Sequence, residues 1–147
     1  MKVPYYKQEF TWSCFATCIK IVLEFIGIKK EEKYLRPLLR ITPYTGGSWY
    51  YVELGLESLG LHFYWSYGFS LDELKELVKN EIPVIVSLRF ESSKKYHFNH
   101  TVVVTDIEDE FIIINDPERG ESIKTGIKEF LETWSERNNI AGYIQKI

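Results

Sequence analysis

Residues 8–18 read QEFTWSCFATC, and this stretch decides the fold because a polar approach here becomes an apolar helix. The next residues, 16–26, are almost entirely apolar, and Gly27 ends the run. Glycine readily adopts the left-handed backbone conformation that closes many helices. We therefore predict a helix of roughly three turns that has Cys14 in its first turn and closes at Gly27.

The start of this helix gives Cys14 a special environment. Thr11 and Ser13 precede it, and both residue types can cap exposed helix amides. Backbone N–H groups in a first turn have no partner within the helix, and the positive end of the helix dipole favours a thiolate over a thiol. A cysteine at this position is prepared to act as a nucleophile.

A nucleophilic cysteine also needs a group that stabilises the oxyanion and a base. Gln8 lies six positions before Cys14, close enough for its amide to fold back over the sulfur. With the Cys14 backbone N–H, it could bind the negative oxygen of a tetrahedral intermediate. The base must come from one of the three histidines, His62, His97 and His100.

His100 is the histidine we expect to act as the base. It stands where a polar segment, 91–99, enters a predicted strand over 101–106, so its ring can point toward a cleft. His97 is the rival, but it lies inside the polar segment, where geometry is less fixed. His62 falls in another predicted strand and is interpreted as structural.

Asp116 is the candidate partner of His100. If strands over 101–106 and 111–115 pair as a hairpin, Asp116 returns to the level of His100 and can accept a hydrogen bond from the imidazole. The composition of residues 116–120 is also explained by a turn alone. Asn115 is an alternative partner, although neighbouring strand residues face opposite ways.

In order along the chain, Gln8, Cys14, His100 and Asp116-Pro117 form a pattern that resembles the papain-like cysteine peptidases. The pattern is most similar to the C39 branch, the bacteriocin-processing type, and the similarity covers nearly the whole chain. The resemblance implies that Cys14 is the nucleophile, His100 the base, Asp116 the residue that orients it and Gln8 the oxyanion-hole residue.

Residues 13–16, Ser-Cys-Phe-Ala, are also similar to the Ser-Cys-Trp-Ala of papain itself. Ser13 and Phe15 replace the Asp and Gly that flank the cysteine in the C39 pattern, and no transporter segment follows. Phe15 favours one alternative, a degenerate module that binds a peptide without cutting it. A second alternative is acyl transfer by the same site to an amine or thiol.

The predicted elements support an α+β fold of the papain-like, C39-like type, with N-terminal helices packed on an antiparallel sheet in a single domain, 1–147. We predict helices over 14–26, 29–36, 49–59, 71–80 and 124–138, and strands over 61–67, 84–90, 101–106, 111–115 and 140–147. The resemblance implies a peptide or protein substrate, with a Gly-Gly leader as one candidate, and chemistry that needs no metal or organic cofactor.

Aromatic residues are candidates for a substrate groove. We expect Trp12, Trp49 and Tyr50 to bind substrate, whereas Tyr51 is assigned to the core. Cys18 is interpreted as a buried apolar residue.

A zinc site would require both cysteines together with His97 and His100. The spacings Cys-x3-Cys and His-x2-His are short enough to allow such a site. Cysteines within an apolar helical run are more often core, so we predict no metal site.

Composition excludes several classes of function. The chain has 147 residues, 18 Lys and Arg, 21 Asp and Glu, and a net charge of −3 without a basic block, so nucleic acid is a poor candidate partner. No apolar run approaches about 18 residues, which argues against a membrane-spanning segment. Residues 1–6 show no signal-peptide pattern, so we expect a cytoplasmic protein.

Overall fold

The computed structural model describes residues 1–90 and 99–147, and it has the α+β architecture expected from the sequence. The elements in chain order are α1 (Cys14–Phe25), α2 (Glu32–Leu38), α3 (Trp49–Glu57), β1 (Leu61–Ser66), α4 (Leu71–Lys79), β2 (Val84–Leu88), β3 (His100–Ile107), β4 (Phe111–Asp116), β5 (Gly120–Gly126), α6 (Ile127–Ser135) and β6 (Ala141–Lys146).

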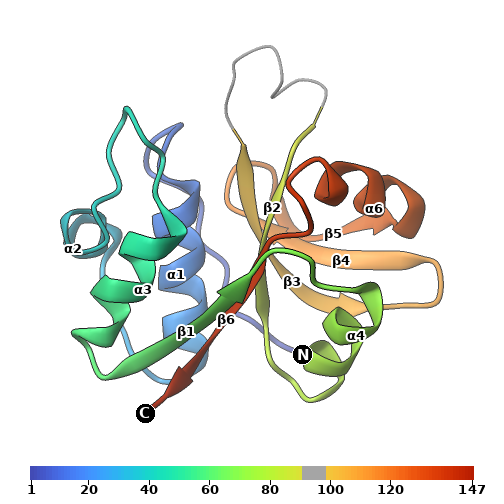
Figure 1. Cartoon of the computed structure of the whole chain (residues 1–147), viewed down its shortest axis with the longest axis horizontal. Coiled ribbons are helices and arrows are strands. Elements are labelled where there is room, and N and C mark those ends of the chain that lie inside the picture. The colour runs from blue at the N-terminus through green and yellow to red at the C-terminus, as the bar shows by residue number, and fades with distance from the viewer. Residues whose placement is uncertain (91–98) are drawn as a thin grey trace.

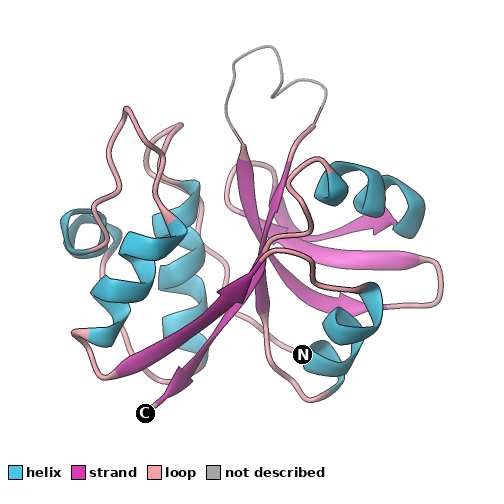
Figure 2. Cartoon of the chain, viewed as in Figure 1, coloured by secondary structure: helices cyan, strands magenta, loops and turns pink. Residues whose placement is uncertain are grey.

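The strands form one antiparallel sheet in the order β1-β6-β2-β3-β4-β5. Helices α1, α2 and α3 gather on one side of the molecule, while α4 and α6 pack on the other half of the sheet (Figures 1 and 2). The interior divides in the same way. One cluster of buried apolar residues lies around α1 and α3, and a second lies between the sheet and the helices α4 and α6.

Helix α1 packs against β3 and ends as the sequence predicts. Gly27 has φ +90°, and the N–H of Ile28 donates to the carbonyl of Leu23 while the N–H of Gly27 donates to that of Glu24. This pair of bonds satisfies two carbonyls that the helix end would otherwise leave open. The helix is buried over residues 14–23.

The expected capping of α1 is wrong in one respect. Ser13 occupies the N-cap position, but its hydroxyl makes no bond to an amide of the helix. Its Oγ instead accepts from the N–H of Phe10 and donates to the carbonyl of the same residue, both at 3.0 Å. The side chain therefore closes the turn before the helix and leaves the first amides of α1 uncapped by it.

Two other helix starts match the sequence. The Oγ of Ser48 accepts from the N–H of Tyr51 at the start of α3, and Ser70 and Glu73 form a capping box at the start of α4. Helix α2 continues two residues beyond the predicted end, because Pro37 so close to the C-terminus of the helix removes only one helical hydrogen bond.

The predicted helix over 124–138 is wrong at its start. Residues 120–126 form strand β5, which pairs with β4 at the edge of the sheet, and α6 begins only at Ile127. An edge strand with one exposed side carries polar and charged residues, so it lacks the apolar alternation that marks a buried strand. That composition made β5 indistinguishable from a turn followed by a helix.

Strands β3 and β4 form the hairpin expected from the sequence. Val103 pairs with Asn115 and Val104 with Ile114, but beyond them the register shifts, so that Asp106 pairs with Ile113. One extra residue of β3 is therefore accommodated as a bulge. None of the helices in the described ranges is both long enough and apolar enough to span a bilayer.

Candidate active site

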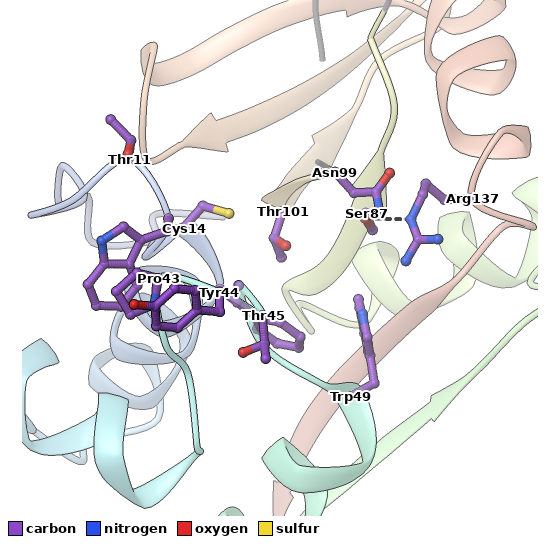
Figure 3. Close-up of a pocket in the computed structure, with 14 residues that line it drawn as sticks. Thr11, Cys14, Pro43, Tyr44, Thr45, Trp49, Ser87, Asn99, Thr101 and Arg137 are labelled. Atoms are coloured by element: carbon purple, nitrogen blue, oxygen red, sulfur yellow. Dashed lines mark hydrogen bonds between the residues drawn. The ribbon is translucent and has the colours of Figure 1, made fainter. Parts of the chain in front are cut away.

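Cys14 is the first residue of α1 and lies against the start of β3. Its side chain is buried, with 6% of the residue exposed, and the sulfur points toward Thr101 (Figure 3). His100 and Thr101 lie beside the sulfur and lower the pKa of the thiol. The helix thus presents the thiol, and the sheet supplies its polar partners.

His100 and Asp116 meet across the β3–β4 hairpin. The Nε2 of His100 lies 2.5 Å from the Oδ1 of Asp116, whose residue is fully buried. The amide side chain of Asn115 is engaged elsewhere, since its Nδ2 donates to the carbonyl of Pro4 and its Oδ1 accepts from the N–H of Ser122. Asp116, not Asn115, is therefore beside the imidazole.

The Asp116 carboxylate is fixed by more than the histidine. Backbone N–H groups of Glu118 and Arg119 donate to Oδ1, and the Nε of Arg119 donates to Oδ2 at 3.0 Å. The Arg119 guanidinium also lies over the ring of Phe90, 4.1 Å from its centroid. The expected turn and the expected interaction with His100 coexist in the same residues.

These contacts change the acidity of all three groups. Burial alone would raise the pKa of Cys14, but the hydrogen bond and positive charge of His100, with the bonds from Thr101, lower it from its ordinary value. Burial would lower the pKa of His100, but the bonds and negative charges of Asp116 and Cys14 raise it to about 9. Burial would raise the pKa of Asp116, yet His100 and the two backbone amides lower it.

The pKa shifts of Cys14 and His100 favour the thiolate and the imidazolium. Each charge stabilises the other, and Asp116 stabilises the imidazolium from the opposite side of the ring. Because Asp116 occupies Nε2, the ring nitrogen left for the thiol is Nδ1. The Glu118 carboxylate, which is largely exposed, lies 4.0 Å from Nδ1 and adds negative charge nearby.

Gln8 lies next to the turn that carries Asp116. Its backbone N–H donates to the carbonyl of Pro117 at 2.9 Å, which ties the approach segment to the hairpin end. Its side-chain Nε2 donates to the carbonyl of Phe10 at 2.8 Å, while its buried Oε1 has no hydrogen-bond partner among the residues that the structure describes. The structure therefore holds Gln8 at the border of the site, with one amide hydrogen committed and the other available.

A pocket opens beside the Cys14 sulfur, between the helical half and the sheet (Figure 3). Its volume is about 450 Å³, and its lining comprises Thr11, Trp12, Cys14, Phe15, Pro43, Tyr44, Thr45, Gly46, Gly47, Trp49, Ser87, Asn99, Thr101 and Arg137. The loop 43–47 forms one wall, and residues of β2, β3 and the turn after α6 form the other. A chain segment can lie in this pocket with its backbone close to the thiol.

Two of the three aromatic residues predicted to bind substrate line the pocket. Trp12 and Trp49 line the pocket, whereas Tyr50 lies outside this lining, is 54% exposed and packs against the ring of Tyr51. Tyr51 is itself 39% exposed, so its assignment to the core is wrong. On α3 these tyrosines point away from the apolar face that packs on the sheet.

Phe15 is turned into the core of the helical half. Only 2% of it is exposed, and its ring packs on Trp49 and Phe63 with centroid separations of 4.8 and 6.4 Å. It contributes one edge to the pocket wall, behind the sulfur. Gly47 is needed beside it, since a Cβ there would lie 3.1 Å from the Phe15 ring and φ is +116°.

Sequence reasoning missed Thr101, Arg119 and Arg137 as residues of the site. Arg119 follows Asp116 by three positions, a spacing that could have suggested it as a carboxylate partner. Thr101 and Arg137 carry no local signal, because they reach the site only through the pairing of β2, β3 and β6.

Two of the four residues of the zinc alternative, Cys14 and Cys18, lie on α1. Both cysteines are free thiols, and the Cys18 Sγ donates to the carbonyl of Thr101 at 3.3 Å. His97, the rival base and a candidate ligand, lies outside the described residues. Within residues 1–90 and 99–147, no group of three or more His, Cys, Asp or Glu side chains could hold a metal ion.

The fold is shared with solved structures of known peptidase domains. A double glycine motif protease from an AMS/PCAT transporter, solved with its leader peptide, has a TM-score of 0.80 at 22% identity, covering 99% of this chain and 93% of that one. The peptidase domain of Streptococcus ComA, a bifunctional ABC transporter of a quorum-sensing pathway, gives 0.81 at 18% identity over 99% and 98%. At these identities the likeness shows the fold alone.

No curated protein is a significant match to this sequence. The family model described as Peptidase_C39 like family matches residues 1–142, nearly the whole chain. The chain therefore belongs to the C39-like peptidase family, as its sequence pattern indicates.

Proposed function

We propose that the chain is one cysteine peptidase domain that hydrolyses peptide bonds with Cys14 as nucleophile. The observation that carries this proposal is the arrangement of Cys14, His100 and Asp116, in which the pKa of the thiol is lowered and that of the imidazole is raised. A nucleophile, a base in contact with it and a third group that orients the base are the parts that covalent acyl transfer requires.

In the first step, the Cys14 thiolate attacks the carbonyl carbon of the scissile amide and forms a C–S bond. The carbonyl π electrons move to oxygen, giving the tetrahedral oxyanion. When that intermediate collapses, the C–N bond breaks and the imidazolium of His100 gives its Nδ1 proton to the leaving amine. The product is an acyl-enzyme and a free amine.

In the second step, the neutral imidazole removes a proton from water as the water oxygen attacks the thioester. The C–S bond then breaks, which releases a carboxylic acid and restores the thiolate and the imidazolium. Asp116 remains ionised throughout, since it is held by His100, Arg119 and two backbone amides. Its role is to orient His100 and stabilise its positive charge.

The oxyanion is bound by the backbone N–H of Cys14 and by the side-chain amide of Gln8. The N–H of the first helical residue has no intrahelical partner, and the helix dipole favours negative charge there. The second hydrogen of the Gln8 Nε2 remains after its bond to Phe10, and the backbone bond to Pro117 keeps Gln8 near the site. Donors of this kind contribute to the rate only in the transition state.

The placement of Phe15 favours an active enzyme over a degenerate binding module. That alternative rests on the bulk of Phe15 beside the sulfur, but the ring packs into the core against Trp49 and Phe63. Acyl transfer by the same site differs only in the acceptor of the second step.

The substrate is an extended peptide with small residues next to the scissile bond. Gly46, Gly47 and Trp49 line the same pocket as the thiol. The similar double glycine motif protease binds a leader peptide, which supports a Gly-Gly sequence as the first candidate. A cytoplasmic location remains a prediction from the sequence.

Cleavage of a peptide library containing Gly-Gly sequences, followed by mass spectrometry, tests the proposal. We expect fragments from the wild-type chain and none from Cys14→Ala, which keeps the fold because alanine fits a site at a helix start. A parallel reaction with a large excess of an amine separates the alternatives. Transfer products without hydrolysis would establish acyl transfer, and peptide binding without any product would establish a binding module.

Gln8 is tested by two variants. Gln8→Glu keeps the shape but replaces the donor with a carboxylate, and Gln8→Ala removes the side chain. Loss of one oxyanion-hole donor costs about 10²–10³ in turnover. Alkylation of Cys14 by iodoacetamide forms no oxyanion, so its rate should be unchanged in Gln8→Ala. Normal turnover in both variants would remove Gln8 from the site.

A further inference from the structure

The pocket beside Cys14 carries a cation on the wall opposite the thiol. Arg137 is the only charged side chain among the described residues that line it. The residue lies in the turn after α6, where its N–H donates to the carbonyl of Trp134 and its own carbonyl accepts from the N–H of Ile140. Both ends of its backbone are therefore fixed, so the side chain starts from a defined position.

The guanidinium is oriented by a single hydrogen bond. Its Nε donates to the Oγ of Ser87 at 3.2 Å, and Ser87 is itself almost fully buried on β2. The rest of the group extends from Ser87 toward the side of the pocket where Trp49 lies (Figure 3). Within the described parts of the chain, neither terminal nitrogen of Arg137 has a hydrogen bond or an ion pair.

Two other arginines of the chain have carboxylate partners. Arg36 pairs with the carboxylates of Glu9 and Glu32, and Arg119 pairs with Asp116. Arg137 has no such partner among residues 1–90 and 99–147, although it is half buried. A half-buried guanidinium without a carboxylate has lost part of its hydration and gained only the Ser87 oxygen in return.

The surroundings of Arg137 also favour an anion in the pocket. Burial has the largest effect and lowers the pKa of Arg137. The phenol of Tyr67 raises that pKa, and the positive charge of Arg89 lowers it. An anion bound in the pocket would relieve both the desolvation and the repulsion between the two arginines.

We propose that Arg137 binds a carboxylate of the peptide substrate and makes the enzyme selective for an acidic group close to the scissile bond. This inference rests on the proposed function, because it takes the pocket as the place where the peptide lies. Arginine suits the task, since its planar fork donates two parallel hydrogen bonds to a carboxylate. Ser87 is a positioning residue that holds the fork toward the pocket.

Peptides that end in a vinyl sulfone, which traps the Cys14 thiolate, provide the test. Matched pairs carry Glu or Gln at the second, third or fourth residue from the electrophile. We expect the wild-type chain to react about tenfold faster with the Glu peptide at one of these positions, in line with a charge-assisted hydrogen bond. Arg137→Gln should lose this preference, and Arg137→Glu should reverse it in favour of a Lys peptide.

Two further measurements identify which carboxylate of the substrate Arg137 binds. The acidic group of the substrate is either a side chain or a free C-terminus, so fluorescent peptides without acidic side chains are compared as free acids and as amides. Their binding is read by anisotropy on Cys14→Ala, which measures the preference without any reaction. Arg137→Lys keeps the charge but not the fork and should retain only part of the preference.

The controls separate this inference from the proposed function. Thermal unfolding of Arg137→Gln shows whether the variant is folded, and the rate with iodoacetamide reports the thiol alone. A normal iodoacetamide rate with equal reaction of Glu and Gln peptides, and equal binding of acids and amides, would overturn the role of Arg137. An unreactive thiol together with a carboxylate preference in the binding assay would overturn the peptidase but retain the role of Arg137.

Discussion

Cys14 and Cys18 lie one turn apart on α1 and are both buried, yet their surroundings change the acidity of the thiols in opposite directions. The pKa of Cys18 is raised well above its ordinary value, first by burial and then by the negative charges of Cys14 and Asp116. The pKa of Cys14 is lowered because His100 and the donors of Thr101 outweigh its burial. The comparison teaches that a nearby cation, not the helix or burial alone, lowers the pKa of a cysteine on this helix.

Thr101 interacts with both thiols and has opposite effects on their acidity. Its interactions with Cys14 lower the pKa of that thiol, while its carbonyl accepts a hydrogen bond from Cys18, which favours the protonated form. A single residue of β3 therefore favours the ionised form of Cys14 and the protonated form of Cys18.

The largest effect expected from this comparison is the site of alkylation. At pH 6.5, iodoacetamide should label the wild-type chain once, and Cys14→Ala should abolish the label because Cys18 is buried and protonated. Intact-mass spectrometry measures both.

Cys18→Ala is the matched control and should be labelled as fast as the wild type. Labelling of Cys18 in folded Cys14→Ala would break the comparison, since it would show that the second turn is also accessible and reactive.

The next effect concerns the cation itself. In His100→Ala, the pKa of Cys14 should rise to the range of an ordinary thiol, about 8.5, so that about 1% of it is ionised at pH 6.5. We expect the alkylation rate at pH 6.5 to fall by up to about 100-fold, and the pH profile should follow a free thiol. Rates measured from pH 5 to 10 test this.

Asp116→Asn sharpens the same comparison at high pH. In the wild type, His100 should stay protonated until the pH rises through about 9, so turnover should fall above that pH as the proton donor is lost. The Asp116 charge raises the pKa of His100, so its removal should move this fall to lower pH. A profile that is the same in both proteins would show that Asp116 does not act on the imidazole.

The smallest expected effect is on stability. Cys18→Ala removes a fully buried sulfur and its bond to Thr101, which should lower the free energy of unfolding by about 1–2 kcal/mol. Cys14→Ala removes a thiol at the border of a pocket and should cost less. Denaturant unfolding of both variants measures the difference, and a larger cost for Cys14→Ala would mean that the first turn is also a structural site.

Much of the site could be predicted from sequence because its signals are local. Cys14 follows a polar approach and opens an apolar run, His100 stands at the start of a strand, and Asp116 closes the next one. Each residue carries the chemistry of its type at an element boundary that turn and cap residues mark. The end of α1 at Gly27 and the start of α4 at Ser70 were predictable for the same reason.

The rest of the site depends on which strands become neighbours. Ser87 and Arg137 are 50 positions apart and meet because β2 lies between β3 and β6 in the sheet. The order of strands is set by the summed packing of two cores, which no local pattern records. Strand β5 was missed because an exposed edge strand lacks the alternation of a buried one.

The bulge in β3 has a consequence for the chemistry of the site. Extending the register of Val103 with Asn115 places Asp116 opposite Val102, two residues from His100 and on the same face of the hairpin. The register on the other side of the bulge differs by one residue, and it would put Asn115 on that face instead. A single inserted residue thus determines whether Asp116 lies on the same face of the hairpin as His100 or on the opposite face. Deletion of one residue at the bulge would therefore turn the carboxylate away from the imidazole, although both side chains would still be present in the sequence.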